Sequence, residues 1–111
     1  MKVILFDIDG TLIRCGGAGL AALLVAMREE FGVENPQSVP VHGCTDQGIV
    51  RELFHANGVT YSEAHWTKFM GLYLEGLKTE LSRSQCHVLP GVEPLLESLS
   101  VDRDLYLGLL T

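Results

Sequence analysis

The sequence predicts an α/β protein in which a helical domain is inserted into a β-α-β scaffold. Apolar runs at residues 3–6 and 105–110 are typical of parallel strands that are buried on both faces. Segments with helical spacing lie between them, and this interval is far longer than the roughly dozen residues that one parallel crossover needs. We therefore predict a partial α/β core at 1–14 and 88–111, and a helical domain at 15–87.

The first strand is predicted from a β-prone run that ends near Gly10. The helix after it is predicted from apolar residues at helical spacing, namely Leu20, Leu23, Leu24, Met27 and Phe31. Gly32 is expected to close this helix, and residues 33–45 are expected to form a loop. A second helix is expected to begin with Asp46 as its N-cap and to end at Gly58.

A third helix is predicted to start near Ser62 and to bury a long apolar stripe. The members of this stripe are Trp66, Phe69, Met70, Tyr73, Leu74, Leu77 and Leu81. Pro90 and Gly91 then break the chain before a short helix, whose first turn tolerates Pro94. The final apolar run is predicted to be a strand, so the expected order is strand, three helices, short helix and strand.

Composition limits the classes of protein and of partner. With 47% hydrophobic and 20% charged residues in 111, the chain is expected to be one globular domain of ordinary size. A formal charge of −6 argues against nucleic acid and anionic membranes as partners. The N-terminal apolar run is too short, and too soon interrupted by Asp7, for a signal peptide.

Cysteine usage bears on the cellular compartment. Cys15, Cys44 and Cys86 are odd in number and show no CxxC spacing. This pattern predicts reduced thiols and a cytoplasmic location, and not a disulfide framework.

Two carboxylates, Asp7 and Asp9, follow the first predicted strand with one residue between them. Residues i and i+2 share a face of a strand, so the two side chains are expected to converge if the extended conformation persists through Ile8. Two converging negative charges suit a hard cation, and Mg²⁺ is usually held by one or two carboxylates together with a substrate phosphate. Gly10 permits a sharp turn, and Thr11 offers a hydroxyl and an N–H to an anion. The alternative is that Asp-Gly forms an ordinary turn at the end of a strand.

Four stretches of the chain resemble one enzyme superfamily. FDIDGTL resembles the first signature of the haloacid dehalogenase-like hydrolases, and LGLLT resembles their second. LPGVEPLL is similar to the segment that returns from a helical cap, and HGCTDQGIV is similar to the cap loop of phosphoglycolate phosphatase-like members. The resemblance covers the whole chain. It implies a Rossmann-like parallel-sheet core, of which this chain supplies about two strands, with an inserted α-helical cap.

The resemblance also implies the chemistry. Asp7 would be the nucleophile and form an aspartyl-phosphate, while Asp9 would be the general acid and base. Both would hold Mg²⁺, and Gly10, Thr11 and Thr111 would bind the substrate phosphate. The implied reaction is Mg²⁺-dependent hydrolysis of a small phosphorylated metabolite. An Asp at position 9 favours phosphoester chemistry over dehalogenation, but it leaves a phosphoglucomutase-like phosphoryl transferase open.

Thr45 and Asp46 are the candidates for a substrate contact from the cap. The favoured alternative is that Asp46 simply caps its helix. Related caps often place Arg before Thr-Asp, where this chain has Cys44, so a cationic contact is not expected there.

The family also uses a lysine and further acidic residues in two later signatures, which would follow Thr111. We therefore expect this sequence to be the N-terminal part of a longer enzyme and to be inactive by itself. A non-catalytic fragment that binds a partner through its sheet edge is the alternative from another class of protein.

Overall fold

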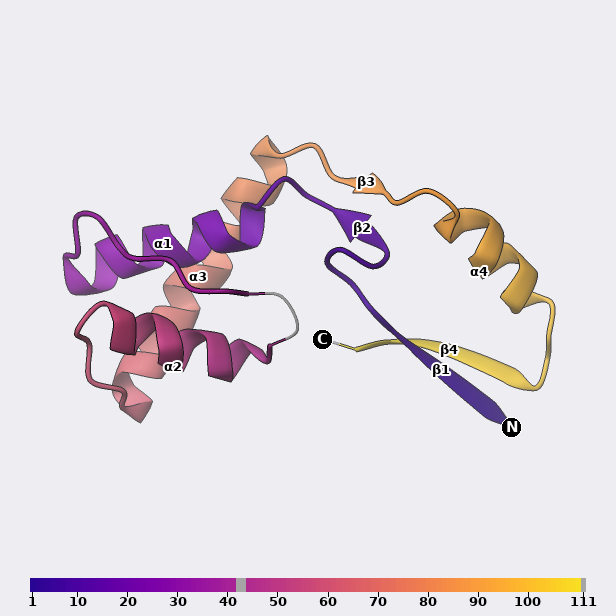
Figure 1. Cartoon of the computed structure of the whole chain (residues 1–111), viewed down its shortest axis with the longest axis horizontal. Coiled ribbons are helices and arrows are strands. Elements are labelled where there is room, and N and C mark those ends of the chain that lie inside the picture. The colour runs from indigo at the N-terminus through magenta and orange to yellow at the C-terminus, as the bar shows by residue number, and fades with distance from the viewer. Residues whose placement is uncertain (42–43, 111) are drawn as a thin grey trace. The chain divides into compact units, whose positions relative to one another are not determined.

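The computed structural model describes residues 1–41 and 44–110, which contain four helices and four strands (Figure 1). In chain order these are β1 (Lys2–Asp7), β2 (Ile13–Arg14), α1 (Ala18–Phe31), α2 (Asp46–Ala56), α3 (Glu63–Arg83), β3 (His87–Val88), α4 (Val92–Ser100) and β4 (Leu105–Leu110). The predicted order of the six longer elements is confirmed. The two-residue strands β2 and β3 were not predicted.

The chain divides into two compact units. The α/β unit consists of Met1–Gly16 and Ser84–Thr111, and the helical unit consists of Gly17–Arg83. The fold is therefore mixed α/β, with the helical unit inserted between two parts of the α/β unit.

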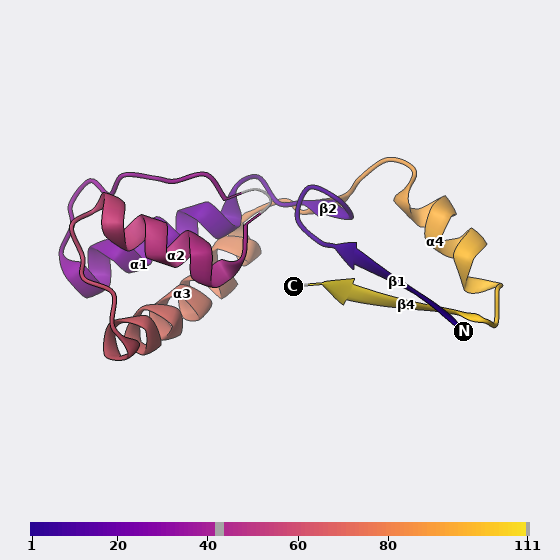
Figure 2. The same ribbon diagram turned by 60° about the horizontal axis from the view of Figure 1, so that its bottom comes forward.

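The sheet of the α/β unit is small. β1 and β4 pair in parallel over their whole length, from Lys2 opposite Leu105 to Asp7 opposite Leu110 (Figure 2). Parallel pairing needs a crossover, and residues 8–104 supply it. Leu5 lies over Gly108, where an added Cβ would come within 3.0 Å of the Leu5 Cδ2 atom. Leu5 itself remains 56% exposed, so the sheet is only partly covered.

α1 confirms the helix predicted from leucine spacing. Its N-cap, Gly17, and its C-cap, Gly32, both have left-handed backbone conformations. The Gly32 N–H donates to the Arg28 carbonyl, which satisfies one of the carbonyls left over at the helix end. α1 packs against α3, and a Cβ added at Gly76 of α3 would lie 3.9 Å from the Ala22 Cβ atom.

The core of the helical unit is aromatic and aliphatic. Its largest fully buried side chains are Phe54, Phe69, Met27, Leu53 and Val50. The rings of Phe54 and Phe69 meet edge to face at 5.1 Å between centroids, and Phe31 meets Phe54 in the same way. Such edge-to-face pairs add to the free energy gained by burying the rings. α2 contributes Ile49, Val50, Leu53 and Phe54 to this core, and all four are buried.

Two local expectations in this unit are wrong. The N-cap of α2 is Thr45 and not Asp46, because the Thr45 hydroxyl accepts the Gly48 N–H at 3.1 Å and Asp46 is already helical. The predicted stripe of α3 is too wide, because Leu74 and Leu81 are exposed. Helical geometry places both leucines on the side of α3 opposite Leu72, Gly76, Thr79 and Arg83, which line a hollow together with residues of α1.

The segment that returns to the α/β unit turns at Gly91, the left-handed N-cap of α4. Pro94 lies in the first turn of α4, as predicted, and Val92 is buried. α4 contacts β4 within the same unit. Within the described part of the chain, no helix combines the length and the apolar character that crossing a membrane requires.

Candidate functional site

The candidate site is the loop that follows β1. Asp7 is the last residue of this strand and lies at its carboxyl end, opposite Leu110 of β4. Its side chain is exposed, and its Oδ2 atom accepts a hydrogen bond from the Thr11 hydroxyl at 3.2 Å. The structure therefore brings together Asp7 and Thr11, two of the residues singled out from the sequence. Ligands of open α/β sheets bind at this end of the strands.

Backbone hydrogen bonds hold the loop in a tight turn. The Ile8 carbonyl accepts the N–H groups of Leu12 at 2.9 Å and Ile13 at 3.2 Å. The Gly10 N–H donates to the Ile13 carbonyl at 2.8 Å. Gly10 has a φ of 76°, in the left-handed region that glycine adopts without a steric penalty. The turn therefore needs a glycine at this position, as the sequence predicted.

Asp9 lies in this turn, beyond the end of the strand. It forms an isolated bridge with Ile13, and its side chain is exposed. Among the described residues, none donates a hydrogen bond to the Asp9 carboxylate. The extended conformation that would align Asp9 with Asp7 ends at Asp7, so the convergence of the two carboxylates stays a prediction.

The hydroxyl and N–H groups of the loop that are expected to bind phosphate already form hydrogen bonds within the loop. The Thr11 hydroxyl donates to Asp7, and the Thr11 N–H donates to the Ile8 carbonyl at 3.3 Å. The Gly10 N–H is also used within the turn. An anion would therefore have to replace these partners. The third candidate, Thr111, lies outside the described residues, so its place in the site stays a prediction.

The donor set around Asp7 suits a hard cation with water or substrate as further ligands. Asp7 and Asp9 offer exposed carboxylate oxygens, which Mg²⁺ prefers. The described residues contain no group of three or more His, Cys, Asp or Glu side chains placed to hold a metal ion. One or two carboxylates are the usual protein contribution to a Mg²⁺ site, so this set is compatible with that ion.

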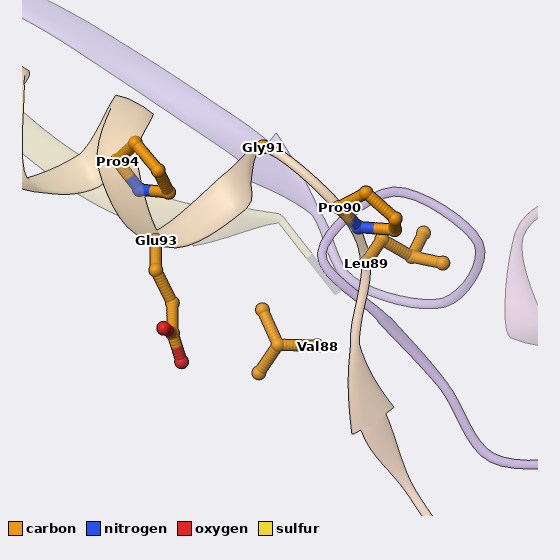
Figure 3. A pocket seen from close by; sticks show the side chains of 6 residues that line it. All are labelled: Val88, Leu89, Pro90, Gly91, Glu93 and Pro94. Carbon is orange, nitrogen blue, oxygen red and sulfur yellow. The ribbon is translucent and has the colours of Figure 1, made fainter.

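No loop residue lines either of two hollows, although Leu89 of the first donates its N–H to the Leu12 carbonyl of the turn. Both hollows have glutamate in their lining. The first lies where β3 leads into α4, and Glu93 is its one charged residue (Figure 3). The second lies between α1 and α3, and its charged lining residues are Glu29, Glu75, Glu80 and Arg83. Carboxylates repel a phosphate, so neither hollow is the better candidate for a phosphorylated substrate.

The cap candidates, Thr45 and Asp46, belong to the helical unit. The Thr45 hydroxyl caps α2 by accepting the Gly48 N–H. Asp46 lies in the first turn, where its negative charge interacts favourably with the helix dipole. Both residues are exposed and have a structural explanation. Their contact with a substrate stays a prediction.

The expectation of three reduced thiols is wrong, because Cys15 and Cys86 form a disulfide. Cys44 is exposed and lies outside this bond. The two partners are 71 residues apart, so no local spacing pattern reveals the pair. A usable signal was present nonetheless, since Cys15 begins the predicted insertion and Cys86 is next to its last residue. The two ends of an insertion leave the scaffold close together, and this brings the two cysteines into reach.

Neither a scan against models of protein families nor a search of curated proteins finds a match to this chain. The loop after β1 and the resemblance of its residue pattern are therefore the features that indicate a function.

Proposed function

We propose that the chain carries the nucleophile and the acid–base group of a Mg²⁺-dependent phosphoester hydrolase of the haloacid dehalogenase-like type. The observation that carries the proposal is the exposed Asp7 carboxylate at the carboxyl end of β1, with the Thr11 hydroxyl on its Oδ2 atom. That hydrogen bond leaves Oδ1 as the oxygen of Asp7 that is available to attack phosphorus. The helical unit would act as the cap, and the sheet would belong to a Rossmann-like core.

The reaction would have two steps. In the first, Asp7 attacks the phosphoryl group of a small phosphorylated metabolite, while the Asp9 carboxylic acid protonates the leaving alcohol. In the second, the Asp9 carboxylate takes a proton from water, which attacks the aspartyl-phosphate and releases inorganic phosphate. The exposure of Asp9 and its position two residues after Asp7 support this division of labour.

Asp7 and Asp9 would hold Mg²⁺, which when bound offsets the repulsion between the Asp7 carboxylate and the substrate phosphate. The loop itself carries no basic residue from Asp7 to Ile13. Each positively charged contact to the transferring oxygens typically contributes about a hundred- to a thousandfold in rate. We therefore expect the 111-residue chain to turn over an alkyl phosphate at close to the rate of an Asp7→Asn variant.

The nucleophile can still be tested in this chain with a donor whose leaving group needs no protonation. We expect acetyl phosphate and Mg²⁺ to phosphorylate Asp7 and to add one phosphoryl group to the intact mass. Borohydride converts an aspartyl-phosphate to homoserine, so peptide mapping identifies the residue. Asp7→Asn should remove the label, and Asp104→Asn, an exposed aspartate of the same unit, should keep it.

The variant Asp9→Asn distinguishes the proposed role of Asp9 from that of Asp7. It should retain the label on Asp7 but slow its hydrolysis by about a hundred- to ten-thousandfold, the usual contribution of a general base. Labelling spread equally over Asp7, Asp102 and Asp104, or no labelling at all, would contradict the proposal. Transfer of the label to a sugar phosphate in preference to water would instead favour the phosphoglucomutase-like transferase.

A further inference from the structure

The disulfide lies where the chain passes between the two units. Cys15 immediately precedes Gly16 and Gly17, at which the chain enters the helical unit, and Cys86 follows Ser84, at which it leaves. Both cysteines belong to the α/β unit. The connecting segments, defined here as residues 12–16 and 84–89, therefore lie side by side and are joined covalently.

Among the residues that the structure describes, few other interactions hold the connecting segments together. β2 and β3 pair over two positions only, Ile13 with Val88 and Arg14 with His87, and the Leu89 N–H donates to the Leu12 carbonyl at 2.9 Å. Arg14, His87 and Val88 are exposed, so this ladder lacks an apolar cover. An isolated two-stranded ladder is at best marginally stable in water. The disulfide is accordingly the principal restraint on these segments.

The bond is also open to attack. Cys86 is exposed, whereas Cys15 is half-buried. Exchange requires a thiolate to reach one sulfur of the disulfide, and access is one of the factors that set its rate. Because Cys86 is the more exposed of the two residues, we expect attack at its sulfur.

We propose that Cys15–Cys86 is a redox-sensitive clasp, which holds the connecting segments together when oxidised and releases them when reduced by a dithiol. One thiolate of the dithiol attacks the Cys86 sulfur, forms a mixed disulfide and displaces the Cys15 thiolate. The second thiol of the dithiol then displaces the Cys86 thiolate and closes its own disulfide. Two electrons pass to the protein, Cys15 and Cys86 end as thiols, and the dithiol ends oxidised.

Hydrogen exchange tests the clasp in the full chain, purified without reductant and compared before and after dithiothreitol. Alkylation followed by mass spectrometry should first find the Cys15–Cys86 bond in the untreated protein. Reduction should then speed exchange in peptides that cover the connecting segments by about tenfold or more, because exchange follows the population of the open form. Peptides from α2, in the packed part of the helical unit, should exchange at an unchanged rate.

Two variants serve as controls. Cys44→Ser should respond to the reductant as the parent chain does. Cys15→Ser combined with Cys86→Ser should exchange fast in the connecting segments whether or not dithiothreitol is present. Equal exchange before and after reduction would overturn the clasp, and so would an equal acceleration in α2. Absence of the bond from the untreated protein would overturn it as well.

Discussion

Different interactions stabilise each of the two units of this protein. Among the described residues, the buried apolar side chains belong to the helical unit with one exception, Val92 of the α/β unit. Phe54 and Phe69 are completely buried, whereas Leu5 and Leu109 of the sheet are more than half exposed. The helical unit is therefore stabilised by an apolar core. The α/β unit depends on the ladder between β1 and β4, the turn after β1 and the disulfide.

The residues proposed for catalysis and the main apolar core therefore belong to different units. The carboxylates proposed for catalysis sit on the less covered unit, in a turn that backbone hydrogen bonds shape. Substitutions in the helical core should change stability strongly, whereas substitutions on the sheet should change it little. The single tryptophan, Trp66, packs against the helical core, so its fluorescence reports the unfolding of that unit.

The largest effect is expected from Phe54→Ala. Its side chain is fully buried and contacts the rings of Phe31 and Phe69 edge to face, so truncation leaves a cavity and removes both ring pairs. We expect a loss of about 3–5 kcal/mol in the free energy of unfolding. Urea unfolding followed by Trp66 fluorescence measures it. A loss below about 1 kcal/mol would show that this unit does not depend on its core as the comparison requires.

A smaller effect is expected from Gly10→Ala in the α/β unit. The left-handed backbone of Gly10 costs an alanine roughly 1–2 kcal/mol, although an added Cβ would meet no atom within 4 Å. We expect faster hydrogen exchange in the peptide that contains the turn, with an unchanged Trp66 unfolding midpoint. Gly71→Ala is the matched control, because Gly71 lies in α3 and alanine should stabilise that helix by up to about 1 kcal/mol. A turn that exchanges at the same rate in Gly10→Ala would argue against backbone strain as its constraint.

Removal of the α2 cap should lower stability by an amount similar to, or smaller than, the cost of Gly10→Ala. Thr45→Ala deletes the hydroxyl that accepts the Gly48 N–H, and N-cap substitutions of this kind cost typically about 1 kcal/mol. The urea midpoint from Trp66 fluorescence should fall accordingly, and Thr45→Ser should restore it. If Asp46→Ala destabilised the helix more than Thr45→Ala does, the observed capping arrangement would be contradicted.

The smallest effect is expected from Leu109→Ala on the sheet. Leu109 is 61% exposed, so truncation should change the free energy of unfolding by less than about 0.5 kcal/mol. The same urea titration, read by far-ultraviolet circular dichroism and by Trp66 fluorescence, compares it directly with Phe54→Ala. A loss as large as that of Phe54→Ala would erase the distinction between the two units.

Local sequence determined most of the secondary structure of this protein. Apolar spacing placed α1, α2 and α4, and glycines marked where α1 ends and α4 begins, because helix periodicity and left-handed caps depend on neighbouring residues only. The position of Asp7 at the end of a strand and the turn at Gly10 could also be predicted from local sequence. These features need no knowledge of distant parts of the chain.

Tertiary structure decided most of the remaining features, because the disulfide, the short ladder and the burial of helix faces depend on residues far apart in sequence. The Cys15–Cys86 bond and the β2–β3 ladder form only when both ends of the insertion meet. The exposure of Leu74 and Leu81 depends on which side of α3 its partner helices cover, and the spacing of apolar residues in α3 does not determine that side. The choice of Thr45 over Asp46 as N-cap, although local, depended on one hydroxyl reaching one N–H. In the candidate site, the sequence identified Asp7 and Thr11, and the turn in three dimensions decided that they bond to each other.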